Sequence, residues 1–297
     1  NLLENAKNFI KTKIDNELLP ITKDNNKKIE NIDDKLFEIY IKEAKKKYRG
    51  RNSPLCAIEA VKASTFLNFN DGLNEERRLF KECHDSLESK SLIHMFFSER
   101  KALKIPDIPG DTELRFINSA AIIGCGTMGG GIAMNFANAG IPVVVIENSQ
   151  ESLDKGLNII KKNYKATLAK GRMREEDFLK RMSLIKGETN IEKISSADII
   201  IEAVFEDMKL KKDMFKIIDS IAKNNAVLAT NTSTLDIDEI ANVTNRPQDV
   251  IGTHFFSPAN VMKLLEVVRG SKTSKEVIAT TMKLAKTIKK TPVLAGN

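Results

Sequence analysis

The stretch SAAIIGCGTMGGGIAMNFANAGIPVVVIE, residues 119–147, carries the strongest structural signal in the chain. Its first apolar run ends in a turn where Gly124, Gly126 and Gly129 fit the pattern G-x-G-x-x-G, and a helix-like segment and a second apolar run follow. Glu147 closes the second run, 23 residues after Gly124. A strand, a glycine turn, a helix and a second strand that ends in an acid are typical of a dinucleotide-binding unit.

Each glycine in such a turn has a separate physical role. The first permits the tight turn, the second lets the backbone approach a pyrophosphate, and the third lets helix and strand pack closely, while the helix N-terminus faces the phosphates. Glu147 would accept hydrogen bonds from the adenine ribose hydroxyls and would repel a 2′-phosphate, so the pattern favours NAD over NADP. The alternative is an ordinary glycine-rich turn beside a surface glutamate, and the complete strand–turn–helix–strand context argues for the cofactor.

Apolar runs alternate with helical segments from this stretch to the end of the chain. Further strand candidates are DIIIEAVFED, NAVLATN, VIGTHFF and KLLEVV. This alternation predicts an α/β fold with a Rossmann-type, doubly wound parallel sheet over residues 117–297. Residues 1–104 instead have the pattern of helices and loops, and KIPDIPGDTE, with two prolines and a glycine, predicts a linker. We therefore expect a helical region at 1–110 and an NAD-binding domain at 117–297.

Composition bounds the class of protein. A chain of 297 residues with 41% hydrophobic and 29% charged residues is typical of a soluble globular protein with a substantial core. No apolar run approaches the roughly 20 residues of a membrane span. The net charge of +7 could suggest nucleic acid, but lysine is abundant throughout, so we expect no such partner. Three scattered cysteines form neither a disulfide framework nor a metal site, from which we expect no metal and a cytoplasmic location.

A second group of residues at later strand ends could do chemistry. His254 ends the strand candidate DVIGTHFF and Glu266 lies in the next one, KLLEVV. Neighbouring strands could bring this carboxylate against the imidazole, beyond the carboxyl ends of the sheet where ligands bind. Such a pair makes a histidine a general base, and a buried structural pair is the alternative. Ser233, in ATNTST, is either a helix N-cap or a third member of this group.

Four segments together, IIGCGTMGGGIA, IIEAVFEDMKLK, LATNTST and GTHFFSPANVMKLLEVV, resemble the NAD-binding domain of L-3-hydroxyacyl-CoA dehydrogenases. The resemblance covers about residues 117–297 and implies NAD-dependent oxidation of (3S)-3-hydroxyacyl-CoA to 3-oxoacyl-CoA in fatty-acid β-oxidation. It implies that His254 takes the hydroxyl proton, that Glu266 orients the histidine, and that Ser233 contacts the substrate hydroxyl or the nicotinamide end. It also implies cofactor contacts from Gly124, Gly126, Thr127, Met128, Gly129, Glu147, Ala203, Val204, Glu206, Lys211 and Asn231.

Residues 53–106 resemble the segment that joins hydratase to dehydrogenase in bifunctional fatty-acid oxidation enzymes. On this resemblance residues 1 to about 50 are the C-terminal helices of an enoyl-CoA hydratase (crotonase-type) domain, whose active-site residues lie outside the chain. The resemblance also implies a parent enzyme with hydratase (lyase) activity and a possible thiolase subunit partner. Many monofunctional dehydrogenases have asparagine three residues after the histidine, whereas this chain has Ser257 there and in this respect resembles the multifunctional members. The chain therefore has the character of an internal piece of a longer enzyme.

Alternatives to this interpretation remain open. One is another 3-hydroxyacid dehydrogenase that acts on small acids without coenzyme A; such enzymes usually rely on a catalytic lysine, and the His–Glu spacing argues against it. Another is an NAD-binding module without turnover, because an active-site asparagine and a closing helical domain of the family would lie beyond residue 297. A third is an enzyme that mainly runs as a reductase. The segment 155–174, with seven basic residues and no acid, is either a solvated helix face or a surface for the coenzyme A phosphates.

Overall fold

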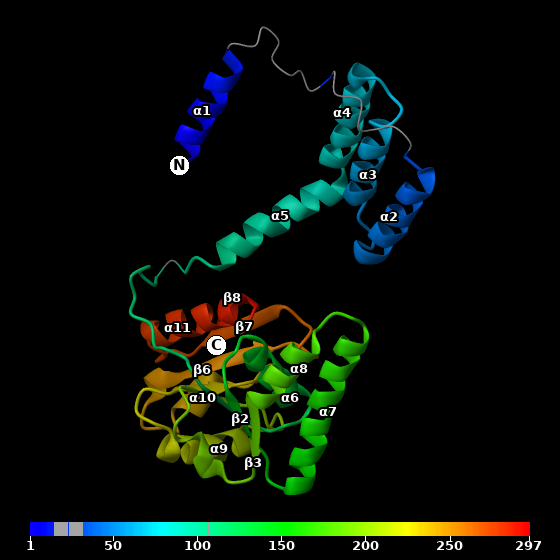
Figure 1. Cartoon of the computed structure of the whole chain (residues 1–297). Helices are drawn as coiled ribbons and strands as arrows, with labels where there is room; N and C mark the ends of the chain where they lie inside the picture. Colours follow the sequence, from blue (N-terminus) through cyan, green and yellow to red (C-terminus); the bar gives the residue numbers. More distant parts are fainter. Residues whose placement is uncertain (15–22, 24–31, 106) are drawn as a thin grey trace. The chain divides into compact units, whose positions relative to one another are not determined.

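The computed structural model describes residues 1–14, 23, 32–105 and 107–297, and it divides into two compact units, Asn1–Phe97 and Ser98–Asn297 (Figure 1). Residues 15–22 and 24–31 of the predicted helical region, and Pro106 of the predicted linker, lie outside the described residues. The assignment of the first unit to a hydratase domain stays a prediction.

The elements of the first unit are helices, and the last of them continues into the second unit. Helix α3 packs against α2 and α4, and the small core among them is built from Phe37, Cys56, Ala63 and Leu79. Pro54 near the start of α3 suits that position because a first-turn N–H has no intrahelical partner. The bounds are α1 (Leu2–Ile14), α2 (Asp34–Lys47), α3 (Ser53–Ala63), α4 (Phe69–Asp85) and α5 (Leu87–Ala102).

The second unit is built on one eight-stranded sheet in the order β3-β2-β1-β4-β5-β6-β7-β8. Strands β1 to β6 run parallel, whereas β7 is antiparallel to β6 and parallel to β8. The reversal has a simple cause: loop 256–263 is shorter than the connection of about a dozen residues that a parallel crossover needs. The strands are β1 (Ala120–Ile123), β2 (Val143–Ile146), β3 (Ile185–Glu188), β4 (Ile199–Glu202), β5 (Val227–Thr230), β6 (Val250–Phe255), β7 (Leu264–Arg269) and β8 (Thr291–Gly296).

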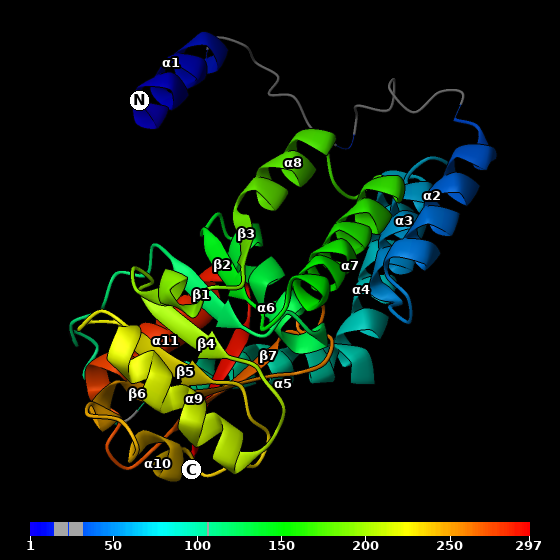
Figure 2. The same cartoon turned by 90° about the horizontal axis from the view of Figure 1, so that it is seen from below.

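Helices cover both faces of this sheet (Figure 2). Alternate residues of β1 enter two separate cores: Ile122 packs with α6, α7 and α11, and Ile123 packs with α9 and α10. Because both faces are buried, the inner strands β1, β2, β4 and β5 are nearly continuous apolar runs rather than alternating ones. The helices are α6 (Thr127–Asn138), α7 (Gln150–Ala169), α8 (Glu175–Ser183), α9 (Met208–Ile221), α10 (Ile237–Ala241) and α11 (Lys275–Thr287), with short 3-10 turns η2 (Ile191–Ile194) and η3 (Pro247–Asp249).

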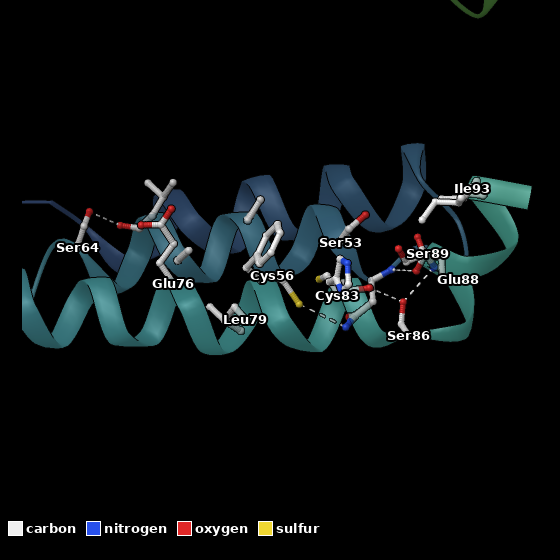
Figure 3. A pocket seen from close by; sticks show the side chains of 17 residues that line it. Ser53, Cys56, Ser64, Glu76, Leu79, Cys83, Ser86, Glu88, Ser89 and Ile93 are labelled. Carbon is white, nitrogen blue, oxygen red and sulfur yellow. Dashed lines mark hydrogen bonds between the residues drawn. The ribbon is translucent and has the colours of Figure 1, made fainter. Parts of the chain in front are cut away.

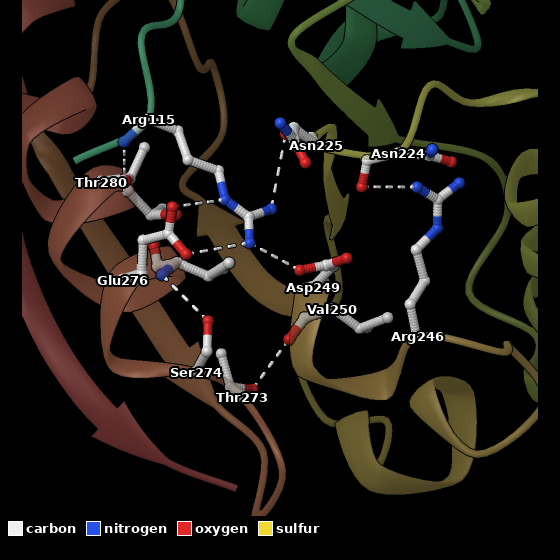
Figure 4. Close-up of polar contacts among 12 residues, drawn as sticks. Arg115, Asn224, Asn225, Arg246, Asp249, Val250, Thr273, Ser274, Glu276 and Thr280 are labelled. Atoms are coloured by element: carbon white, nitrogen blue, oxygen red, sulfur yellow. Dashed lines mark hydrogen bonds and ion pairs between the residues drawn. The ribbon is translucent and has the colours of Figure 1, made fainter. Parts of the chain in front are cut away.

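Ion pairs fasten the segment before β1 to the second unit (Figure 4). The Arg115 guanidinium donates to Asp249 at 2.7 Å and to Glu276 at 3.1 Å, and its backbone N–H donates to Thr280 Oγ1 at 2.9 Å. Nearby, Arg246 pairs with Asp219 and donates to backbone carbonyls at the end of α9. The segment that leads into the sheet is thus part of the folded unit.

Within the described part of the chain, no helix combines the length and apolar character needed to cross a membrane. The same residues contain no group of three or more His, Cys, Asp or Glu side chains arranged to hold a metal ion.

Candidate functional site

The glycine turn lies between β1 and α6, and its glycines are required for different reasons. Gly124 has φ +98°, and a Cβ there would lie 2.8 Å from the Ala203 carbonyl oxygen. A Cβ on Gly129 would lie 1.9 Å from the Gly124 oxygen, so the helix and strand could not pack. A Cβ on Gly126 would meet nothing within 4 Å, so its open face leaves room for a ligand. The first N–H groups of α6, at Thr127 and beyond, have no intrahelical acceptor and suit an anion.

Glu147 follows β2 and turns back to the glycine turn. Its Oε1 accepts the Cys125 N–H at 2.7 Å, and its Oε2 accepts the Asn148 N–H at 3.2 Å. Burial, and then the Glu147 charge, raise the pKa of the Cys125 thiol to about 11, so this thiol stays protonated and is a poor nucleophile. An open glycine face, a helix N-terminus and a carboxylate beside them fit the phosphates and a ribose of a dinucleotide.

His254 and Glu266 stand directly opposite each other in the β6–β7 register. The imidazole Nδ1 lies 2.7 Å from Glu266 Oε2, and Nε2 lies 3.3 Å from the Ser233 hydroxyl. The histidine side chain is 18% exposed and that of the glutamate 37%, so the pair is partly desolvated yet open to a ligand. Because a carboxylate only accepts, Nδ1 carries a hydrogen toward Glu266, and Nε2 is the ring nitrogen that faces the Ser233 hydroxyl.

Ser233 is held by Glu206. Glu206 Oε1 accepts the Thr232 hydroxyl at 2.5 Å and the Ser233 N–H at 2.7 Å. Burial acts to raise the pKa of Glu206, but these hydrogen bonds and the Lys211 charge outweigh it and leave the pKa below its ordinary value. Helix α10 is capped by Asp236, whose carboxylate accepts two N–H groups of its first turn. Ser233 is therefore not the cap of that helix, and it belongs with His254.

Lys211 lies inside the domain rather than on the surface of the site. It has 0% exposure, and its ammonium donates to both carboxylate oxygens of Glu202 at 2.9 Å and to the Asn231 carbonyl at 3.1 Å. Glu202, equally buried, also accepts the Val204 N–H at 2.7 Å and the Thr230 hydroxyl at 2.6 Å. The pair ties together the ends of β4 and β5 and the start of α9, and it leaves the Lys211 side chain with no exposed surface.

Glu202 is the site residue that the sequence reasoning missed. Its signal was a carboxylate that closes the apolar strand IIIE, nine residues before Lys211. Asn231, which was predicted, joins the same edge through its side chain, whose Oδ1 accepts the Phe255 N–H at 3.0 Å. Ala203 follows β4 and donates its N–H to the Ile123 carbonyl at 2.8 Å. The predicted cofactor and catalytic residues thus gather along one edge of the sheet, at the carboxyl ends of its parallel strands.

The basic segment 155–174 forms most of α7 and the turn after it. The helix buries Leu153, Gly156, Ile160 and Tyr164 against the domain and leaves its lysines exposed. This amphipathic pattern accounts for the helix, and both interpretations of its charge stay open.

A hollow of about 760 Å³ lies in the first unit, between α3, α4 and α5 (Figure 3). Burial, and then the neighbouring Cys83, raise the pKa of the Cys56 thiol in its wall to about 11. The walls are otherwise mostly apolar, with Leu79, Phe80 and Leu92 among them. None of the predicted site residues lines this hollow.

Comparison with known proteins gives consistent matches. Residues 119–297 match the family model described as 3-hydroxyacyl-CoA dehydrogenase, NAD binding domain. The peroxisomal bifunctional enzyme of Cavia porcellus is 39% identical over 268 residues, 89% of this chain and 37% of that protein. The glyoxysomal fatty acid β-oxidation multifunctional protein MFP-a of Brassica napus is 39% identical over 246 residues, 82% of this chain and 34% of that protein. The chain thus spans a little over a third of the length of these relatives.

Solved structures show the same likeness. The (S)-3-hydroxybutyryl-CoA dehydrogenase of Ralstonia eutropha superposes with a TM-score of 0.60 and 36% identity, over 61% of this chain and 64% of that chain. The dehydrogenase part of multifunctional enzyme 1 from C. elegans gives a TM-score of 0.61 and 35% identity, over 69% of this chain and 49% of that chain.

The prediction of a cytoplasmic location is wrong, because the relatives are named as peroxisomal or glyoxysomal proteins. It rested on three unpaired cysteines. Unpaired thiols argue only against an oxidising secretory compartment, so cysteine content does not separate the cytoplasm from the interior of other organelles.

Proposed function

The chain belongs to the family of the 3-hydroxyacyl-CoA dehydrogenase NAD-binding domain, and from this premise we propose that it carries the proton-transfer site for the oxidation of (3S)-3-hydroxyacyl-CoA to 3-oxoacyl-CoA. Family membership confirms the resemblance drawn from the four motifs, the NAD cofactor and the Rossmann-type fold. The observation that carries the proposal is the placement of His254 between Glu266 at 2.7 Å and Ser233 at 3.3 Å, on the sheet edge that also holds the glycine turn.

In the proposed reaction His254 Nε2 accepts the proton of the substrate 3-hydroxyl. Glu266, bonded to Nδ1, stabilises the imidazolium that forms, and the Ser233 hydroxyl positions the alcohol oxygen. NAD⁺, when bound, supplies the acceptor for the hydride that leaves C3. The hydroxyl thereby loses its proton and C3 its hydride, and the carbonyl of the product forms. General base catalysis of this kind contributes on the order of 10²–10⁴ in rate.

The proposed cofactor contacts divide between two groups of residues. The open face of Gly126 and the first turn of α6 receive the pyrophosphate, and Glu147 receives the adenine ribose. The ends of strands β4 and β5 lie between the glycine turn and His254 in the order of the sheet. We assign the residues that follow them, Ala203, Val204 and Asn231, to the nicotinamide end. Glu206, through Thr232 and Ser233, and the Lys211–Glu202 pair, through the Asn231 carbonyl, hold the chain at that end in place.

We also propose that the protein acts within a bifunctional β-oxidation enzyme. In support, an alignment of 268 residues with the Cavia porcellus enzyme must reach well upstream of residue 119, so it includes much of the helical region. On this proposal residues 1–110 are the end of an enoyl-CoA hydratase domain and its linker. The hydratase activity and the thiolase partner stay predictions. On this proposal we expect the protein in peroxisomes, as the names of its relatives indicate for them. Expression with a fluorescent tag and co-localisation with a peroxisomal marker would test this expectation.

The activity itself is tested by titrating the chain with NADH and then adding acetoacetyl-CoA, while the absorbance of the reduced nicotinamide is followed. We expect NADH to bind and then to be oxidised. His254→Asn should bind NADH with unchanged affinity and lose about 10²-fold or more in rate. His84→Asn, at an exposed histidine of the first unit, is the matched control and should change neither quantity. Binding without oxidation by the wild-type chain would contradict the proposed activity while leaving the cofactor site intact.

A further inference from the structure

Loop 256–263 connects the strand that ends near His254 to the strand that carries Glu266. Most of the loop is exposed, including Val261 at 65%, but Ala259 in its middle is fully buried. The Ala259 carbonyl accepts two hydrogen bonds, one from Asn135 Nδ2 at 3.0 Å and one from the ammonium of Lys290. One buried residue therefore anchors the loop that closes the proposed catalytic hairpin.

The loop is pressed against the cofactor helix α6. A Cβ on Gly131 would lie 3.0 Å from the Ala259 Cβ and 3.2 Å from the Asn260 nitrogen. Asn135, one turn further along α6, donates to the same loop residue. Helix and loop can approach this closely because Gly131 has no side chain. Helix α6, which begins at the glycine turn, thus contacts loop 256–263, which follows His254.

Lys290 also donates to this loop. It is 8% exposed and precedes β8, and its ammonium donates to the carbonyls of Ala259 and Met262, the second at 2.6 Å, with the Phe255 ring centroid 5.9 Å away. Among the residues that the structure describes, no carboxylate lies within ion-pair distance of this nitrogen. Burial lowers the pKa of Lys290 to about 8. A buried cation costs free energy unless its hydrogen bonds are satisfied, and here loop carbonyls accept two of the three N–H groups of the ammonium.

We propose that Lys290 is a positioning residue for the reaction: its ammonium holds loop 256–263 against helix α6 and so keeps His254 opposite Glu266. The inference rests on the proposed function, because the position of the histidine matters only if it transfers the proton. Without the ammonium the Met262 carbonyl loses this donor and the Ala259 carbonyl keeps only the hydrogen bond from Asn135, so the loop that joins β6 to β7 is held less firmly. A catalytic group displaced by about 1 Å can lose on the order of 10²-fold in rate.

The test compares Lys290→Met with Lys286→Met, an exposed lysine on α11 that provides the same substitution nearby. We expect amide hydrogen exchange in loop 256–263 to be about tenfold faster or more in Lys290→Met and unchanged in the control. We expect the rate of NADH oxidation by acetoacetyl-CoA to fall about tenfold or more, while the NADH dissociation constant stays within about threefold. Lys290→Gln, whose amide keeps N–H donors without the charge, should fall between the wild type and Lys290→Met, and it also serves if Lys290→Met does not fold.

Two results would overturn the inference: unchanged loop exchange in both Lys290 variants, or a parallel loss of NADH affinity and rate, which would mean general loss of structure. A wild-type chain that binds NADH without oxidising it would instead remove the proposed function, and the catalytic role of Lys290 with it. The exchange measurement would then still show whether Lys290 holds the loop, so the two failures are distinguishable.

Discussion

Among single side chains, the proposed chemistry depends most on the partner of His254 Nδ1. Glu266 is its acceptor at 2.7 Å. Glu266→Gln keeps the shape of the side chain but removes the charge that stabilises the imidazolium. We expect kcat to fall on the order of 10²-fold or more with little change in NADH affinity, measured by stopped-flow oxidation and by NADH fluorescence titration. If both quantities fell equally, Glu266 would be a structural residue.

Lys290 predicts a pH dependence of stability. Its pKa is about 8 in the folded protein, against an ordinary value of 10.5. Between these values the unfolded chain binds more protons than the folded one, so the free energy of unfolding from this group rises with pH. We expect wild type to gain stability relative to Lys290→Met between about pH 8 and about pH 10, measured by urea unfolding at both pH values. A constant difference would mean that Lys290 titrates normally.

In the turn between β1 and α6, two glycines have different roles, one in folding and the other in cofactor binding. Gly129→Ala places a methyl group 1.9 Å from the Gly124 oxygen, whereas Gly126→Ala places one in open space. We expect Gly129→Ala to lower stability by about 1–3 kcal/mol or more through overpacking, measured as a lower Tm. We expect Gly126→Ala to keep its Tm within a few degrees and to weaken NADH binding about tenfold, because its methyl group would occupy the space of the pyrophosphate. Equal effects of the two substitutions on Tm would contradict this division.

Considering the whole chain, the proposed site lies entirely within residues 98–297, and Arg115 fastens the entry to that unit. We therefore expect a protein of residues 107–297 to bind NADH as the full chain does. A protein of residues 118–297 lacks Arg115 and leaves the buried Asp249 without its cation. This loss should lower the free energy of unfolding by about 3–5 kcal/mol. Thermal unfolding and NADH titration of both proteins check this. Equal stability would show that the ion pair contributes nothing.

Local signals in the sequence were sufficient for the β1–α6–β2 unit. Glycine spacing, apolar runs and a terminal acid lie within 119–147, so their geometry follows from neighbouring residues. The same holds for His254 and Glu266, whose strands adjoin along the chain and whose separation of twelve residues places them in one hairpin register. Fold class, cofactor and family could therefore be predicted without coordinates.

Contacts between distant segments could be found only in the folded chain. Glu202 lies beneath the site because β4, β5 and α9 converge on it, and Lys290 reaches Ala259 across 31 residues. Whether Ser233 capped a helix or joined His254 depended on Asp236, which occupies the cap instead. A motif records the spacing of residues along the chain, whereas the packing of a buried charge is set by every element that surrounds it, and those elements come together only when the sheet has formed.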